Sequence, residues 1–137
     1  IDGHDVMVDG AHNPQKIAAF LGELTRRPEW ARPSVVFAAK RGKDWMESLE
    51  TISRLADVVH VTQFFRGMTS PHLQNYSVKP EEFAAVISAC NMKNAKQFDT
   101  PIDAFNTALQ YDRPVVVVGS MYMLGELHEQ LHAAGRL

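Results

Sequence analysis

Polar residues suited to holding an anion follow the first hydrophobic run of the sequence, in the stretch Asp-Gly-Ala-His-Asn-Pro from Asp9 to Pro14. Asn13 is a preferred helix N-cap and proline fits the first helical position, so a helix is predicted to begin at Pro14. The start of a helix offers backbone N–H groups and partial positive charge to a phosphate or carboxylate. We therefore predict a ligand site flanked by Asp9, His12 and Asn13, although these residues taken alone are more simply explained as a capped turn.

Two other turns carry residues of matching chemistry, each directly after a hydrophobic run. One spans Lys40 to Asp44 and contains Lys43, and the other is Gly119–Ser120. Lysine and a helix-start serine are donors suited to phosphate and carboxylate groups, and carboxylates accept hydrogen bonds from ribose hydroxyls. Because the strand-to-helix turns of a parallel sheet gather at one edge, we expect both turns to lie beside Asp9–Asn13.

The elements that must position these turns alternate between hydrophobic runs and amphipathic stretches. Strands are predicted over 4–8, 34–39, 57–65, 95–98 and 115–118, and helices over 14–27, 45–55, 72–74, 80–90, 101–109 and 121–134. Asp44 and Glu47 have the spacing of a capping box, and Thr100 is placed as an N-cap. Hydrophobic runs without strict alternation are typical of a parallel sheet covered on both faces, so we predict a doubly wound, mostly parallel, Rossmann-like α/β fold.

The composition, with 45% hydrophobic and 22% charged residues, indicates one globular domain over residues 1–137. A formal net charge of -2 provides no basic surface for nucleic acid, and no hydrophobic run is long enough for a membrane span. Cys90 falls on a helical apolar stripe, so we expect a buried, reduced thiol in a cytoplasmic protein without membrane or nucleic-acid partners. The sequence begins at Ile1 rather than Met, which suggests a piece of a longer protein.

Two catalytic motifs are matched only in part. Gly42–Lys43 lacks the following Ser or Thr and the preceding glycine of a phosphate-binding P-loop, because Asp44 and Phe37 occupy those places. The stretch from His128 to His132 reads His-Glu-x-x-His, a zinc-protease pattern, but no third ligand follows it. We interpret it as the polar side of a terminal helix, predict no metal site, and assign no catalytic residue within this domain.

Four stretches, in order along nearly the whole chain, resemble the C-terminal domain of folylpolyglutamate synthase and of bifunctional dihydrofolate synthase/folylpolyglutamate synthase, in the Mur ligase superfamily. They are Asp9–Pro14, Lys43–Asp44, the Arg-Gly-Met stretch at 66–68 followed by Pro71, and Val115–Gly125. Gly10 favours the folate branch, because peptidoglycan-building Mur ligases usually carry a bulkier residue there. The resemblance implies a doubly wound α/β domain of the Mur ligase C-terminal type.

The resemblance also implies an activity, that of an ATP-dependent amide ligase that adds L-glutamate to dihydropteroate or folate through an acyl phosphate. It implies that a separate N-terminal P-loop domain, acting in cis, holds most of the ATP phosphates and the Mg²⁺. That domain is not in this sequence, so the chain in isolation is expected to be inactive.

Roles for individual residues follow from the same resemblance. Those implied for nucleotide binding are Asp9 at the ribose, His12 at the phosphates, and Asn13. Those implied for glutamate binding are Lys43 and Ser120, with Lys40 and Asp44 as further candidates. Lys40 is included because the family turn usually has an acid directly before Lys-Asp, whereas Gly42 stands there in this sequence.

Two other functions stay open at this stage. A stand-alone nucleotide- or phosphate-binding α/β module would have the same turns but would bind its ligand without a second domain. The C-terminal domain of a peptidoglycan Mur ligase would share the fold and add an amino acid to a nucleotide-linked precursor. A P-loop domain encoded upstream of Ile1 would separate the ligase hypotheses from the module.

Overall fold

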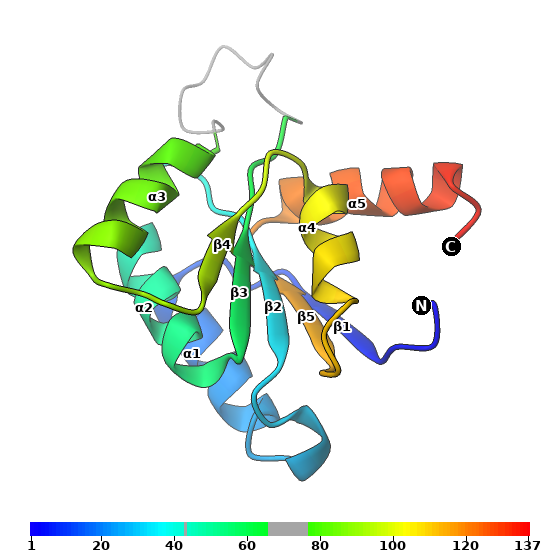
Figure 1. Ribbon diagram of the computed structural model, residues 1–137, viewed down its shortest axis with the longest axis horizontal. Helices are drawn as coiled ribbons and strands as arrows, with labels where there is room; N and C mark the ends of the chain where they lie inside the picture. The colour runs from blue at the N-terminus through cyan, green and yellow to red at the C-terminus, as the bar shows by residue number, and fades with distance from the viewer. Residues whose placement is uncertain (43, 66–76) are drawn as a thin grey trace.

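In the described part of the chain, five parallel strands form one sheet at the centre of the molecule, in the order β1-β5-β2-β3-β4. The computed structural model describes residues 1–42, 44–65 and 77–137, and Figure 1 shows the sheet between two helical layers. The strands are β1 (Val6–Asp9), β2 (Ser34–Phe37), β3 (Val58–Val61), β4 (Ala95–Gln97) and β5 (Val115–Val118). The predicted doubly wound α/β fold is confirmed.

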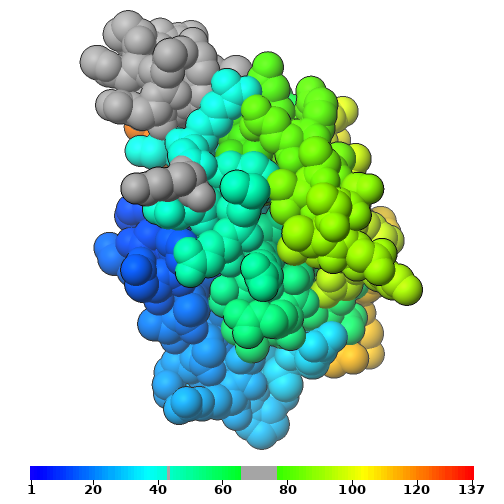
Figure 2. All heavy atoms as spheres, turned by 90° about the vertical axis from the view of Figure 1, so that its left-hand side faces the viewer, coloured from blue at the N-terminus to red at the C-terminus, as the bar shows by residue number. Residues whose placement is uncertain are grey.

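Helices cover both faces of this sheet. They are α1 (Pro14–Leu24), α2 (Trp45–Leu55), α3 (Pro80–Ala89), α4 (Pro101–Ala108) and α5 (Met121–Ala133), with a 3₁₀ turn at η1 (Pro28–Trp30). Figure 1 shows α1, α2 and α3 on one face and α4 and α5 on the other, and Figure 2 shows the surface that the first three form. No helix in the described ranges is long and apolar enough to cross a membrane.

The central strands β2 and β5 separate two apolar cores, and every residue of both strands is buried. Alternate side chains of a strand point to opposite faces of the sheet. Val35 and Val116 therefore join the core under α1, α2 and α3, while Val36 and Val117 join the core under α4 and α5. Burial on both faces explains why these strands are continuous hydrophobic runs in the sequence.

Local capping signals place several helix starts. Asn13 Oδ1 accepts a hydrogen bond from the Lys16 N–H at 2.9 Å, and Thr100 Oγ1 accepts one from the Asp103 N–H at 3.2 Å. In both helices proline follows the cap directly. The predicted capping box at Asp44 is wrong, because Asp44 has φ -101° and ψ -6° rather than the extended backbone of a cap, and its side chain makes no capping hydrogen bond.

Several predicted element ends differ by one to four residues from those observed, and two of them differ by three or more. The first helix ends at Leu24 rather than at residue 27, because Thr25 Oγ1 donates to the Leu21 carbonyl and the chain then enters η1. The third strand is shorter than residues 57–65, since β4 pairs with it only as far as Val61.

The prediction of a buried thiol is wrong. Helix α3 ends at Ala89, so Cys90 occupies its C-cap and is exposed rather than continuing the apolar stripe. The short helix predicted over 72–74 lies outside the described residues.

The order of the strands creates a switch point at β5. Strands β1 and β2 lead into α1 and α2 on one face of the sheet, whereas β5, which lies between them, leads into α5 on the other face. Neighbouring strands here send their chains to opposite faces, so the turns at their carboxyl ends separate and leave a crevice. The three turns that carry the candidate residues are the turns at this crevice.

Candidate functional site

A cavity of about 350 Å³ lies beyond the carboxyl ends of β1, β5 and β2. Its wall is formed mainly by residues 12–13 after β1, by 39–42 and 44–45 after β2, and by 119–122 after β5. The cavity is therefore the crevice that the strand order creates, and it occupies the position where open parallel sheets bind their ligands.

The turn after β5 requires glycine. Gly119 has φ +117°, and a Cβ at this position would lie 2.2 Å from the Ala38 carbonyl oxygen and 2.6 Å from the Phe37 ring. This close approach brings the β5–α5 turn against the chain that leaves β2. Ser120 follows, and its Oγ accepts hydrogen bonds from the N–H groups of Tyr122 and Met123, in the first turn of α5, at 3.1 and 3.4 Å. The serine is consequently held, almost fully buried, in the cavity wall.

The turn after β1 satisfies several of its own backbone donors. Asp9 Oδ1 accepts a hydrogen bond from the Ala11 N–H at 2.8 Å, Asn13 caps α1, and Pro14 has no N–H. His12 is exposed, and its Nδ1 lies 3.1 Å from a carbonyl oxygen of the same turn. An anion bound here would therefore depend on the His12 side chain and the helix dipole more than on free backbone N–H groups, the donors predicted from the sequence.

The loop after β2 presents basic side chains at the cavity. Lys40 is exposed, and its backbone pairs with Ser77 in a short antiparallel bridge. Arg41 Nη2 lies 2.6 Å from Glu82 Oε1 in α3. Partial burial would raise the pKa of Glu82, but hydrogen bonds from the Lys79 N–H and from Arg41, together with both positive charges, hold that pKa below its usual value. The ion pair therefore ties this loop to α3 at neutral pH.

Aromatic packing fixes the start of α2 beside the cavity. Trp45 packs edge-on against Phe83 with ring centroids 5.1 Å apart, and Phe83 packs against Phe37 at 5.9 Å. Phe37 and Phe83 are fully buried in the core. The position of Asp44, which precedes Trp45 and also lines the cavity, is thus set by core packing rather than by a cap.

Most of the predicted site residues come together in the structure. The predicted residues that line the cavity are His12, Asn13, Lys40, Asp44 and Ser120. Asp9 does not line it and lies instead in an adjoining groove beside α1, to which His12 also contributes. Lys43 lies outside the described residues.

Arg41 and Tyr122 are among the lining residues that were not named individually as site residues, although Arg41 belongs to the predicted turn from Lys40 to Asp44. Arg41 follows Lys40 in the same polar turn, so its place in the sequence was a sufficient signal. Tyr122 stacks on Phe64, with ring centroids 5.4 Å apart. In the sequence it resembles any partly buried residue of the first turn of α5, and only the position of that turn beside β2 identifies it.

Charged and polar side chains line the cavity. Lys40 contributes positive charge, Arg41 is paired with Glu82, and Asp44 is the one acidic residue among the described residues of the lining. In the described part of the chain no three His, Cys, Asp or Glu side chains are arranged to hold a metal ion. His128 and His132 stack their rings on the surface of α5, with centroids 6.4 Å apart. Fold and site together define a doubly wound α/β domain with a cavity lined by polar and charged side chains at its switch point.

Comparison with known proteins makes this class more specific. A family model described as the C-terminal domain of dihydrofolate synthetase matches residues 2–131, so the chain belongs to this family. A probable dihydrofolate synthetase of Schizosaccharomyces pombe is 28% identical over 132 residues, which cover 93% of this chain and 31% of that protein. The chain thus spans just under a third of the length of this curated relative, and the resemblance predicted from the four motifs is confirmed.

Solved structures of folylpolyglutamate synthases share the fold. Escherichia coli FolC, in complex with DHPP and ADP, superposes with a TM-score of 0.73 at 21% identity, covering 95% of this chain and 29% of that chain. The bifunctional folylpolyglutamate synthase/dihydrofolate synthase of Yersinia pestis, complexed with AMPPNP and Mn ion, has a TM-score of 0.72 at 20% identity. The match covers 93% of this chain and 28% of that chain. For the Mycobacterium tuberculosis folylpolyglutamate synthase the TM-score is 0.70 at 22% identity. That match covers 91% of this chain and 29% of that chain.

Proposed function

We propose that this chain is the C-terminal domain of an ATP-dependent ligase that joins L-glutamate to dihydropteroate or to a folate. The observation that carries the proposal is the family match over residues 2–131. The curated relative is about three times as long as the matched region, since the chain covers 31% of it. This difference supports a further domain in the same polypeptide, and from the family resemblance we propose that it is an N-terminal P-loop domain that completes the catalytic cleft.

The proposed reaction has two steps. The carboxylate of dihydropteroate or folate attacks the γ-phosphorus of ATP, which releases ADP and forms an acyl phosphate. The amine of L-glutamate then attacks the acyl carbon, the amide bond forms, inorganic phosphate leaves and the amine loses a proton. ATP and glutamate are both anionic, so this domain contributes by binding and orienting negative charge beside the reacting groups.

The β1–α1 turn is proposed to face the nucleotide. His12 lines both the cavity and the groove that contains Asp9, so a nucleotide spanning the two would have its phosphates near His12 and its ribose near Asp9. The Asp9 carboxylate already accepts from the Ala11 N–H and retains further lone pairs for a ribose hydroxyl. Asn13 fixes the start of α1 and lines the cavity beside His12.

The other two turns are proposed to hold the glutamate. Lys40 and Ser120 line the cavity and supply an ammonium group and a hydroxyl to the glutamate carboxylates. Asp44 lines the same cavity and suits the amine of the incoming amino acid. Lys43 is a second candidate lysine, on the basis of the sequence.

Mg²⁺ is proposed to be held mainly by the P-loop domain. The Yersinia pestis relative carries an Mn ion with its nucleotide analogue, which supports a divalent metal in the reaction. Mg²⁺ requires about six oxygen ligands, whereas the described lining of the cavity contains the single carboxylate of Asp44. The residues described here therefore do not fit a metal site of their own, and we derive no catalytic step from the metal.

An assay of the full-length protein tests the proposal. We expect ADP release that requires both L-glutamate and a dihydropteroate or tetrahydrofolate acceptor, with a glutamylated product detected by mass spectrometry. The chain described here should show no turnover alone, because it contains half of the cleft. Ligation of another amino acid to a nucleotide-linked peptidoglycan precursor would contradict the proposal, and tight ATP binding by the isolated chain would favour the stand-alone module.

Variants of the β1–α1 turn test the nucleotide site. His12→Ala and Asp9→Ala in the full-length enzyme should each raise the KM for ATP about 10-fold or more, since a hydrogen bond to a charged group contributes about 1.5–3 kcal/mol. His12→Ala should leave the melting temperature unchanged because His12 is exposed, whereas Asp9→Ala also deletes the acceptor of the Ala11 N–H and should lower it modestly. Lys93→Ala, at an exposed position between α3 and β4, is the matched control. A large loss of stability with intact ligation would assign both residues a structural role.

A further inference from the structure

Ser48 brings a buried hydroxyl to the wall of the cavity. The residue lies in α2, one helical turn after Asp44, and only 2% of its surface is exposed. Its Oγ forms no hydrogen bond with a described residue, and it is not one of the unpaired atoms that are sealed from solvent in that part of the chain. The hydroxyl therefore opens into the cavity. A buried polar group without a partner is costly, so its presence points to a ligand that supplies the partner.

Two other serines, Ser34 and Ser53, find their partners within the protein. Ser34 is fully buried, and its Oγ lies 2.9 Å from His60 Nε2. Ser53 belongs to α2 as Ser48 does, and its Oγ donates to the Glu50 carbonyl at 2.9 Å. A helical serine can satisfy its hydroxyl in this way by bonding to the preceding turn. Ser48 does not, so its hydroxyl is available to a bound molecule.

The first turn of α2 is open at the same wall of the cavity. The Ser48 N–H donates to the Asp44 carbonyl at 3.2 Å, but the Asp44 side chain does not cap the helix. Within the described residues, no acceptor is paired with the N–H groups of Trp45, Met46 and Glu47. Such a helix start offers its N–H groups and the positive end of its dipole to an anion. Helical side chains lean toward the N-terminus, so the Ser48 hydroxyl projects toward this turn.

The two other helices that begin at the cavity have caps. In α1, Asn13 accepts a hydrogen bond from the first turn, and Pro14 has no N–H to offer. In α5, Ser120 accepts from the N–H groups of Tyr122 and Met123. Of the three helices, α2 therefore leaves the most first-turn N–H groups to a ligand.

Asp44 decides which kind of anion fits this turn. Asp44 and Ser48 both line the cavity, and side chains four residues apart in a helix lie on one face with Cβ atoms about 5–6 Å apart. An α-amino acid carries its amine and a carboxylate on one carbon, so the amine can face Asp44 while the carboxylate faces Ser48 and the free N–H groups. A phosphate has no cationic group to place against Asp44. The turn therefore suits the head group of an amino acid better than a nucleotide phosphate.

Building on the proposed function, we infer that Ser48 Oγ and the first-turn N–H groups of α2 bind the α-carboxylate of the amino acid that the ligase adds. Asp44 accepts a hydrogen bond from its amine, and Lys40 and Ser120 are then left for the side-chain carboxylate of L-glutamate. Ser48 is thus a specificity-determining residue. It lets the enzyme distinguish an α-amino acid from an amine that carries only the side-chain carboxylate.

Substrate competition in the full-length protein tests the role of Ser48. The competing amines are L-glutamate, 4-aminobutyrate, which lacks the α-carboxylate, and L-glutamine, which lacks the side-chain carboxylate. Ser48→Ala should lower the ratio of kcat/KM for L-glutamate to that for 4-aminobutyrate by about 10-fold or more, because a hydrogen bond to a charged group is lost. The ratio for L-glutamate to L-glutamine should not change. Ser48→Thr keeps the hydroxyl and should retain most of the discrimination against 4-aminobutyrate.

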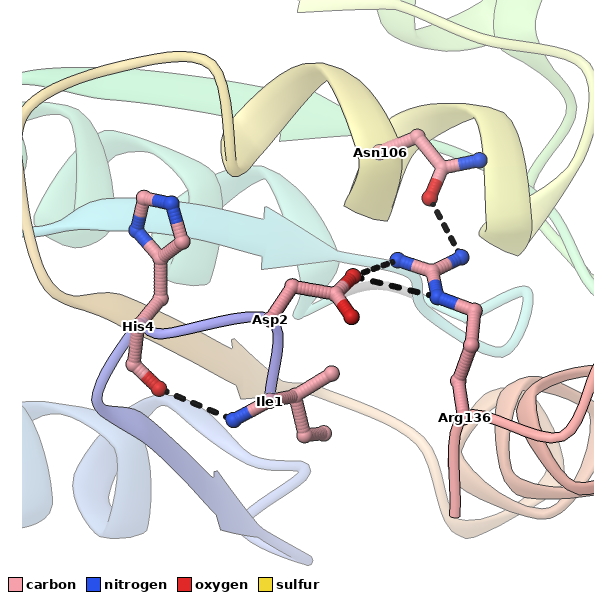
Figure 3. Close-up of polar contacts among 5 residues, drawn as sticks. All are labelled: Ile1, Asp2, His4, Asn106 and Arg136. Atoms are coloured by element: carbon pink, nitrogen blue, oxygen red, sulfur yellow. Dashed lines mark hydrogen bonds and ion pairs between the residues drawn. The ribbon is translucent and has the colours of Figure 1, made fainter.

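Two control variants and a stability measurement separate binding from structure. Ser53→Ala removes a hydroxyl from the same helix outside the cavity. Arg136→Ala removes paired groups, because Arg136 donates to Asp2 Oδ2 at 3.1 and 2.5 Å and to Asn106 Oδ1 at 2.8 Å (Figure 3). Neither control should alter the substrate ratios, and Arg136→Ala should lower the urea midpoint. Ser48→Ala should leave that midpoint unchanged or raise it, because no hydrogen bond is lost and alanine is favoured in a helix.

The outcomes distinguish this role of Ser48 from the proposed function as a whole. In an enzyme that ligates L-glutamate, an unchanged ratio to 4-aminobutyrate in Ser48→Ala would overturn the role of Ser48 alone. A changed ratio to L-glutamine instead, or a lowered urea midpoint, would do the same, since the first indicates the side-chain carboxylate and the second a structural hydroxyl. A parent enzyme that does not ligate L-glutamate would overturn the proposed function, and the role of Ser48 with it.

Discussion

Replacing Gly119 with alanine should severely destabilise the domain, and the structure gives the size of the effect. An L residue at the observed φ of +117° is strained, at a cost of about 1–3 kcal/mol. The added Cβ would lie 2.2 Å from the Ala38 carbonyl oxygen, where a contact of at least 3.0 Å is needed, so the two backbones must separate by about 0.8 Å. Overpacking of this kind costs about 1–3 kcal/mol more. The total of about 2–6 kcal/mol is a large part of a typical folding free energy of about 5–15 kcal/mol.

Gly22→Ala is the matched control for this substitution. Gly22 lies within α1, and a Cβ there would meet no atom within 4 Å. Because alanine is favoured over glycine in a helix by up to about 1 kcal/mol, this variant should be more stable than the parent. Urea denaturation followed by circular dichroism gives both free energies of unfolding. A loss below about 1 kcal/mol for Gly119→Ala, or a destabilised Gly22→Ala, would refute our account of the contact that shapes the cavity.

Three further predictions concern the fold. Burial and the positive charge of Lys96 lower the pKa of His60 to about 4, so the unfolded state binds the proton more tightly, and stability is complete above about pH 6.5 and falls toward pH 4. The imidazole should account for a loss of about 3 kcal/mol between pH 7 and pH 4 in urea titrations, and His60→Gln should remove that portion of the pH dependence. Thr100→Ala should cost about 1 kcal/mol by deleting the cap of α4, and an unchanged urea midpoint would argue against the 3.2 Å hydrogen bond. Cys90, exposed at the end of α3, should react with a maleimide in the native protein as fast as in urea, and native protection would contradict its exposure.

The order and type of the described elements could be predicted from the sequence because their signals are local. Hydrophobic runs located the five strands, and the caps at Asn13 and Thr100 located two helix starts to the residue. Asp44 shows the limit of such signals, because the residue has helical rather than extended backbone angles and Trp45 packs against Phe83 to begin α2 instead. The prediction that Cys90 is buried failed for a related reason, since helical spacing does not reveal that α3 ends at Ala89, one residue before Cys90.

The site depends on contacts between distant parts of the chain, which the sequence does not specify. Insertion of β5 between β1 and β2 is what brings Ser120 to the same cavity as His12 and Lys40. The individual turns were predicted because each follows a strand and contains polar residues. The exclusion of Asp9 from the cavity and the inclusion of Tyr122 depend on how those turns lie in space, and only the structure supplies that information.

The central claim is that the cavity at the switch point binds the glutamate that the full-length ligase adds. The most direct test is the KM for L-glutamate of the Lys40→Ala/Lys43→Ala double variant, which removes both candidate lysines, measured beside Lys93→Ala. We predict an increase of about 10- to 100-fold for the double variant, from the loss of a charged hydrogen bond of about 1.5–3 kcal/mol, and no change for Lys93→Ala. An unchanged KM for L-glutamate in the double variant would contradict the account.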